Sequence, residues 1–167
     1  MDVYNLCSTM SERSIALADK LLFEGERTAQ FFENLSAMQW LHQMYDHGAK
    51  WTVRGVFEHL IVSERQLQQL FEMIVRTKVG TPESMDVNLL NLERTGTLGL
   101  FSCAEMARDY RSTRQQTIEF TRELTDAQLA IRARHPAIGE SALEDQIKLL
   151  YIHHQMHVRE VKKALAL

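Results

Sequence analysis

The chain has 167 residues and a formal net charge of −3 at pH 7, with 22 acidic and 19 Lys or Arg residues interspersed along it. The basic residues are therefore not clustered, and the sequence gives no indication of a nucleic-acid partner. The start lacks a signal-peptide layout, no apolar run approaches the roughly 18 residues of a membrane span, and the two cysteines form no CxxC pair. We expect one domain over residues 1–167, in the cytoplasm, with no membrane or nucleic-acid partner.

Capping signals and helical periodicity predict long helices at about 11–34, 52–78, 102–123 and 141–165, with short helical pieces near 37–45 and 125–130. Several starts have capping-box spacing, in which a Ser or Thr oxygen accepts from the N–H three residues on while a Glu or Gln reaches back. These pairs are Ser36–Gln39, Ser102–Glu105, Thr125–Gln128 and Ser141–Glu144. No stretch shows the sustained period-two alternation of a strand, so the predicted fold class is all-α.

The second and third helices are joined by VGTPESMDVNLLNLERTGTLGLF, more than twenty residues. Antiparallel neighbours in a bundle need only two to eight connecting residues, whereas a loop this long can run the roughly 40 Å length of a helix. The connection predicts a four-helix bundle with a long crossover between helices two and three, which then run parallel (up-down-down-up). The apolar residues that would let the crossover pack down as a pocket wall are Leu89, Leu90, Leu92, Leu98 and Leu100.

Three of the seven histidines lie in the segment YIHHQMHVRE. His153 and His157 are four residues apart and His154 and His157 are three apart, so either pair can converge on one ion, and periodicity leaves both pairs open. Histidines at such spacing often have no metal, and a metal site needs a third ligand. His59, on the flank of the second helix's apolar stripe, is a candidate; a half-buried, hydrogen-bonded histidine is the alternative. The others, His42, His47 and His135, lie near predicted loops and are predicted to be surface residues.

Two charged residues interrupt stripes that are otherwise apolar. Glu64 lies at the centre of the stripe of the second helix, and Arg114 at the centre of that of the third. Because a buried charge without a partner costs several kcal/mol, we expect the two to form a buried ion pair between neighbouring helices. The alternative is that one or both side chains reach the surface.

Three segments in this order resemble the DinB-like (damage-inducible B) superfamily, from about residue 30 to the C-terminus. They are WTVRGVFEHLIVSE, SCAEMARDYRSTRQQTIEFTRELTDAQL and HPAIGESALEDQIKLLYIHHQMHVREV. The resemblance implies a four-helix bundle with a long crossover and a divalent metal held by three histidines, one from helix two and two from an HxxxH motif. Carried over, these are His59, His153 and His157, which favours His153 over His154. The chain departs at Met156, often a histidine, and at Glu160, often a glutamine.

The resemblance implies a metal-dependent enzyme, since three histidine ligands leave open the coordination positions that mark a catalytic site. The expected chemistry is transfer of a low-molecular-weight thiol such as bacillithiol or mycothiol, or hydrolysis, on a small-molecule substrate. A non-catalytic metal-binding protein, stress-associated or acting as a scaffold, is the alternative. The metal is expected to be Zn or Ni, with Fe or Mn as further options. Family members often pair, and a homodimer is predicted from apolar residues beyond the needs of one bundle seam: Phe31, Phe32, Phe71 and Phe120.

Overall fold

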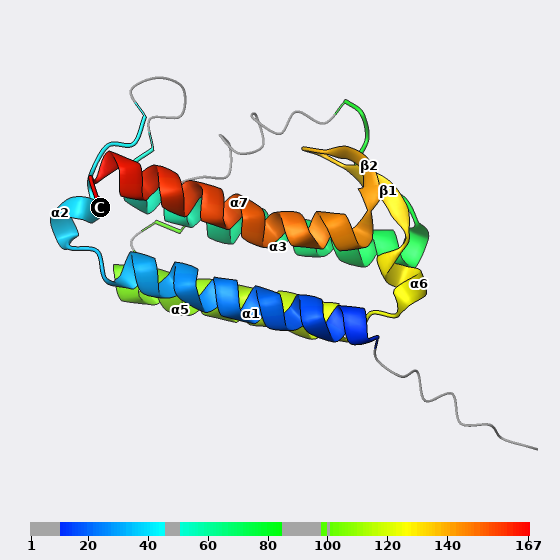
Figure 1. The fold of residues 1–167 in the computed structure, drawn as a ribbon. Coiled ribbons are helices and arrows are strands. Elements are labelled where there is room, and N and C mark those ends of the chain that lie inside the picture. The colour runs from blue at the N-terminus through cyan, green and yellow to red at the C-terminus, as the bar shows by residue number, and fades with distance from the viewer. Residues whose placement is uncertain (1–10, 46–50, 85–97, 100) are drawn as a thin grey trace, which may run out of the picture.

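The computed structural model describes residues 11–45, 51–84, 98–99 and 101–167. Its long helices are α1 (Glu12–Glu33), α3 (Val53–Thr77), α5 (Cys103–Arg122) and α7 (Leu143–Ala164). Each helix packs on two others, in the order α1, α5, α3, α7 around the bundle. Figure 1 shows α1 and α7 running one way and α3 and α5 the other. The predicted four-helix bundle, with its second and third long helices parallel, is confirmed.

Most helix starts follow the predicted caps. Both halves of the capping box form at Ser36, Ser102 and Thr125, which begin α2 (Ala37–Trp40), α5 and α6 (Asp126–Leu129). The box predicted at Ser141 is wrong, because α7 begins after Ala142 with no side-chain cap and Ser141 belongs to a strand. The helix predicted over 37–45 ends at Trp40, since the chain then turns into a bridge that pairs Gln43 with Thr52.

A short hairpin corrects the expectation that the chain has no strands. Strand β1 (Arg132–His135) pairs antiparallel with β2 (Gly139–Ala142), and His135 lies opposite Gly139. Four residues a strand are too few for period-two alternation to stand out in a sequence. Gly139 has a φ of +70°, which favours glycine and lets the chain reverse between the strands. The hairpin packs on the first half of α7, where Gln146 Nε2 donates to the Ala133 carbonyl at 2.8 Å.

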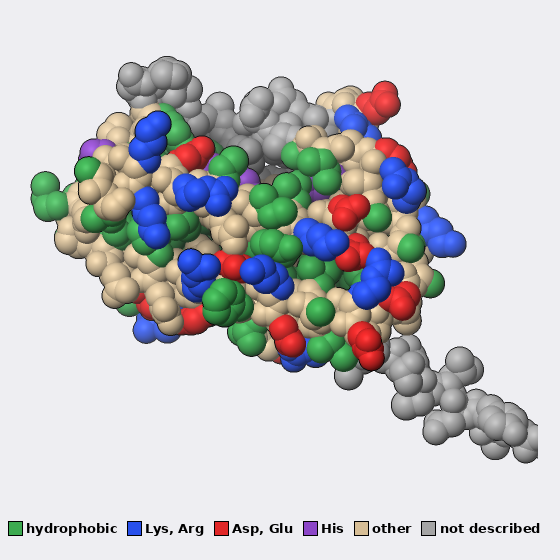
Figure 2. All heavy atoms as spheres, viewed as in Figure 1, with side chains coloured by type: hydrophobic (Ala, Val, Ile, Leu, Met, Phe, Trp, Pro, Cys, Tyr) green, Lys and Arg blue, Asp and Glu red, His purple; other side chains and the backbone are tan. Residues whose placement is uncertain are grey.

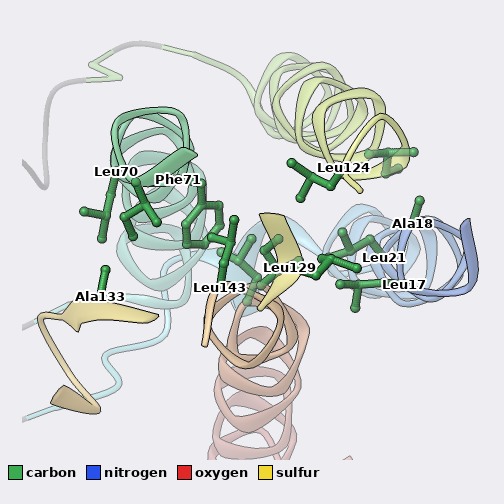
Figure 3. Packing of buried hydrophobic residues seen from close by; sticks show 13 residues of the cluster. Leu17, Ala18, Leu21, Leu70, Phe71, Leu124, Leu129, Ala133 and Leu143 are labelled. Carbon is green, nitrogen blue, oxygen red and sulfur yellow. The ribbon is translucent and has the colours of Figure 1, made fainter. Parts of the chain in front are cut away.

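Apolar residues form two separate clusters, one at each end of the bundle. The cluster at the hairpin end combines α1, α3, α5, α6, β1 and α7 and includes Leu21, Phe71 and Leu143 (Figure 3). The cluster at the α2 end includes Phe32 and Phe57, whose rings stack with centroids 4.2 Å apart. Between the two clusters, each long helix contributes buried polar residues: Glu24 and Thr28, His59 and Glu64, Arg114 and Thr117, and His154 and His157. We call this group the polar layer.

The crossover runs from the hairpin end of the bundle to the α2 end. It starts on β1, where the Thr81 N–H donates to the Arg134 carbonyl at 2.9 Å, and it ends beside α3, where Leu98 N–H donates to Glu58 at 2.8 Å. Gly80 makes the first contact possible, because a Cβ there would lie 2.3 Å from the Arg134 oxygen. Leu98 packs against the core as predicted. The other predicted wall residues, Leu89, Leu90, Leu92 and Leu100, lie outside the described residues.

Two of the phenylalanines on which the homodimer was predicted are core residues. Phe32 and Phe71 are fully buried, while Phe31 and Phe120 are partly buried against the two clusters. The homodimer stays a prediction with reduced support. Figure 2 shows acidic and basic side chains interspersed over one face. None of the helices in the described ranges has the length and apolar character needed to cross a membrane.

Candidate metal centre

The three histidines predicted as ligands converge in the polar layer. Because α3 and α7 are antiparallel neighbours, the first half of α3, with His59, meets α7 from its middle onward, with His153 and His157. The His153 and His157 Nε2 atoms are 3.0 Å apart, and the His59 ring lies 5.3 and 5.4 Å from their ring centroids. One ring nitrogen from each residue lies within 4.8 Å of the other two. We call this group the three-histidine cluster.

Burial keeps the cluster uncharged at neutral pH. It lowers the pKa of His59 to about 3, with further lowering by His153 and His157. It also lowers the pKa of His153 to about 4. The pKa of His157 is lowered by burial too, although the Glu160 carboxylate opposes the change. Imidazole must be neutral to bind a metal, so the cluster presents three competent donors at pH 7.

A carboxylate and a phenol hold His157 in place. The His157 Nδ1–H donates to Glu160 Oε2 at 2.9 Å, and the Tyr45 hydroxyl donates to the same oxygen at 3.0 Å. Burial, followed by the hydrogen bond to Glu160, raises the pKa of Tyr45 to about 12, so the phenol remains a donor. With its Nδ1 proton engaged, His157 turns the lone pair of Nε2 toward the cluster. A carboxylate on the far nitrogen is the usual partner of a metal-binding histidine.

An indole ring covers His59. Trp51 stacks on the imidazole with ring centroids 4.7 Å apart and an interplanar angle of 28°. Two backbone hydrogen bonds join the segment around Trp51 to the one before Tyr45, Met44 N–H to the Trp51 carbonyl at 2.8 Å and Val53 N–H to the His42 carbonyl at 2.9 Å. The Gln43 side chain donates to the Tyr45 carbonyl at 2.8 Å. The segment before α3 thus supplies the indole that stacks on His59 and the hydroxyl that donates to Glu160, the partner of His157.

His154, the alternative left open by periodicity, does not join the cluster. It is 1% exposed, and its Nδ1 accepts from the Arg114 guanidinium at 2.8 Å and lies 2.9 Å from the Tyr110 hydroxyl. Arg114 also pairs with Glu64 at 2.9 Å, with both side chains at most 4% exposed. The predicted buried ion pair between the second and third long helices is confirmed. His154 therefore belongs to the interior side of the polar layer.

The prediction that the remaining histidines lie at the surface holds for one of them and is wrong for another. His42 is exposed as predicted, and His47 lies outside the described residues. The prediction that His135 is a surface residue is wrong, because it is 2% exposed on the inner side of β1. Burial lowers its pKa to about 4. The error follows from the missed strand: without β1, nothing in the sequence indicates that His135 points inward.

An up-down-down-up bundle whose second and fourth long helices bring three histidines together defines a helical-bundle protein with a candidate three-histidine metal centre. The chain belongs to the DinB superfamily, whose sequence model matches residues 21–161. Among solved structures it is similar to YfiT from Bacillus subtilis, described as a probable metal-dependent hydrolase with an unusual four-helix bundle topology. The identity is 18% and the TM-score 0.74, over 96% of this chain and 91% of that chain. A search of curated proteins gave no significant match.

Proposed function

We propose that this protein is a metal-dependent hydrolase whose three-histidine cluster holds one divalent ion. The convergence of three neutral ring nitrogens from α3 and α7 is the observation that carries the proposal. The description of the similar YfiT as a probable metal-dependent hydrolase supports the choice of reaction. A divalent ion held by three imidazoles keeps coordination positions open and lowers the pKa of water toward neutrality, which supplies a nucleophile for ester or amide hydrolysis.

The donor set fits such an ion. Imidazole ligands suit Zn, Ni, Cu and Fe, and the ions expected here are Zn or Ni. The Nε2 atoms of His153 and His157, only 3.0 Å apart, share one proton or one cation, because two facing lone pairs repel each other. The Nδ1–H of His157 is already given to Glu160, so this ring offers Nε2 alone. A cation could therefore replace the proton that the two Nε2 atoms share.

The surrounding residues have separate tasks. Glu160 fixes the tautomer and orientation of His157, and Tyr45 fixes Glu160. Trp51 covers one face of the His59 ring and keeps water from it. On the interior side, the ion pair of Glu64 and Arg114 anchors the α7 turn that carries His153, through the bond from Arg114 to His154.

Metal content tests the ligand assignment. Purified protein incubated with excess Zn²⁺ and dialysed is expected to retain one zinc per chain, measured by inductively coupled plasma mass spectrometry. His59→Ala and His153→Ala should each lose it, whereas His42→Ala, which alters an exposed histidine, should keep it. Retention of the full zinc content by His153→Ala would remove this residue from the site.

Turnover tests the reaction. Zinc- and nickel-loaded protein is to be incubated with a panel of esters and amides, with and without low-molecular-weight thiols, and products followed by mass spectrometry. Water-dependent cleavage that stops with a chelator and in His153→Ala supports the hydrolase. Products that carry the thiol would show that the reaction is not hydrolysis but the thiol transfer implied by the family resemblance. Full metal loading without turnover would favour the non-catalytic alternative.

A further inference from the structure

His135 carries a buried hydrogen-bond donor without a partner. Its Nδ1 accepts from the Ala137 N–H at 3.1 Å, so the proton of the neutral ring lies on Nε2. This Nε2 is buried and has no hydrogen-bond partner among the residues that the structure describes. Leaving a buried N–H unpaired destabilises a fold, and such groups often have a functional explanation.

The strand that carries this donor packs on α7, the helix of His153 and His157. Ala133 and His135 share the inner face of β1, because side chains two apart in a strand point the same way. Ala133 packs on the start of α7, with its carbonyl bonded to Gln146. From there β1 advances toward the tip of the hairpin, which in Figure 1 points in the direction in which α7 runs. His135 is thus two residues nearer the hairpin tip than Ala133, on the inner face of β1.

Electrostatics agree with this placement. The pKa of His153 is lowered first by burial, then by His157, and then by His135. A charge on His135 would thus be felt at His153, although the two residues belong to different elements. Pro136 and Gly139 close the hairpin beyond His135, and the bond to the Ala137 N–H holds the ring against the turn. The ring is fixed at one nitrogen and free to donate at the other.

We propose that His135 is a substrate-positioning residue, whose Nε2–H donates to an oxygen of the ligand bound at the three-histidine cluster. This inference rests on the proposed function and narrows it to ligands with a carbonyl or carboxylate oxygen close to the reacting atom. A neutral N–H donor stabilises negative charge that develops on such an oxygen, and does so more strongly where water is excluded. Because the ring is uncharged, it does so without repelling a cation held by the neighbouring histidines.

Two substitutions separate the nitrogens of His135. In His135→Asn, Oδ1 replaces Nδ1 as acceptor for the Ala137 N–H, while nothing reaches the position of Nε2. In His135→Gln, the longer amide places an N–H near the position of Nε2 and gives up the turn acceptor. A purely structural role predicts that Asn is the better replacement, whereas substrate positioning predicts that Gln is.

Acetate is the probe, and the Co²⁺-loaded protein reports its binding through the visible absorption bands of cobalt. His135→Asn is expected to weaken acetate binding about ten- to hundredfold, the effect of losing one hydrogen bond to an anion, with cobalt content unchanged. His135→Gln should stay within about threefold of the unsubstituted protein. Equal acetate affinity in His135→Asn and the unsubstituted protein would overturn the proposal.

A measurement on the unsubstituted protein covers the case in which both variants are damaged. In ¹⁵N-labelled, zinc-loaded protein, the His135 Nε2–H resonance should move downfield when acetate is added. An unchanged resonance under saturating acetate overturns the proposal whatever the variants do. Failure of the unsubstituted protein to bind a metal ion would instead count against the proposed function. If the protein binds metal and cleaves esters, but substitution of His135 leaves its affinity for acetate unchanged, this inference alone is wrong.

Discussion

The ion pair of Glu64 and Arg114 is open to a double-mutant test. Glu64 is fully buried and Arg114 is 3% exposed. Arg114 donates to Glu64 from Nε and from a terminal nitrogen, the latter at 3.0 Å, and Thr117 donates to the other carboxylate oxygen at 2.7 Å. Glu64→Gln keeps the size of the side chain and removes its charge. Arg114→Met keeps much of the length and removes the guanidinium.

The expected magnitude follows from what each change leaves behind. Glu64→Gln leaves a guanidinium in the interior with neutral neighbours only, and it should lower the free energy of unfolding by about 3–5 kcal/mol. Arg114→Met leaves the carboxylate with one hydroxyl donor and deprives His154 of its guanidinium partner, so a loss of similar size is expected at pH 7.5. That is about a fifth or more of the 5–15 kcal/mol by which a typical domain is stable.

The double variant Glu64→Gln, Arg114→Met removes both charges together. It should lose far less than the sum of the two single variants, with a coupling energy of about 2–3 kcal/mol. Urea unfolding of the four proteins, followed by circular dichroism, gives these values. Simple additivity of the two single losses would show that the side chains do not interact, and would refute the polar layer as described.

A change of pH separates the two single variants further. A carboxylate left without a partner can take up a proton, but a guanidinium stays charged. The loss caused by Arg114→Met, measured against the unsubstituted protein at the same pH, should therefore be smaller at pH 5 than at pH 7.5. The loss caused by Glu64→Gln should change little. The opposite pattern would contradict the assignment of the stranded charges.

Three further predictions concern the surroundings of the site. Burial lowers the pKa of His135 from 6.5 to about 4, so between these pH values the unfolded chain binds more protons than the folded one, and this residue should lower the free energy of unfolding by about 1.4 kcal/mol at pH 5.5. In urea unfolding, His135→Asn should therefore lose less stability than the unsubstituted protein between pH 7.5 and pH 5.5. Glu160→Ala should weaken zinc binding about 10–100-fold by competition with a chromophoric chelator, and Glu160→Gln less, because it can still accept from His157. Gly80→Ala would place a Cβ 2.4 Å from the Arg134 nitrogen and should cost about 1–3 kcal/mol; an unchanged melting temperature would speak against this close approach.

The helical framework was predictable because its signals are local. Capping boxes at Ser102 and Thr125 use neighbours three residues apart, and apolar periodicity over twenty residues identifies a helix without knowledge of its partner. The crossover was predictable from length alone, since it must span the bundle. The hairpin was not, because its four-residue strands are held by pairing with each other and by packing on α7. Ser141 has the spacing of a helix cap, but in the folded chain it pairs with Ala133 in the hairpin.

The site was predictable to the extent that its residues lie on those helices. His153 and His157 share a helix face by spacing, but His154 has equal claim, and only the resemblance to the superfamily separated the two. In the folded chain the separation has a physical basis, because His154 faces Tyr110 and Arg114 in the interior. Tyr45 and Trp51 reach the site through loop hydrogen bonds that no periodicity encodes.

The division of the core explains how a small bundle can hold so many ionisable groups at its centre. The two apolar clusters bury Leu, Ile and Phe side chains at both ends and drive folding through the area they remove from water. In the polar layer between them, charged and polar groups pair with one another, Glu64 with Arg114 and Arg114 with the Nδ1 of His154. His59, His153 and His157 occupy the other side of this layer, where the Glu160 carboxylate accepts from His157. Since these rings are already neutral and held in place, a cation that enters gains three ligands without the entropic cost of ordering them.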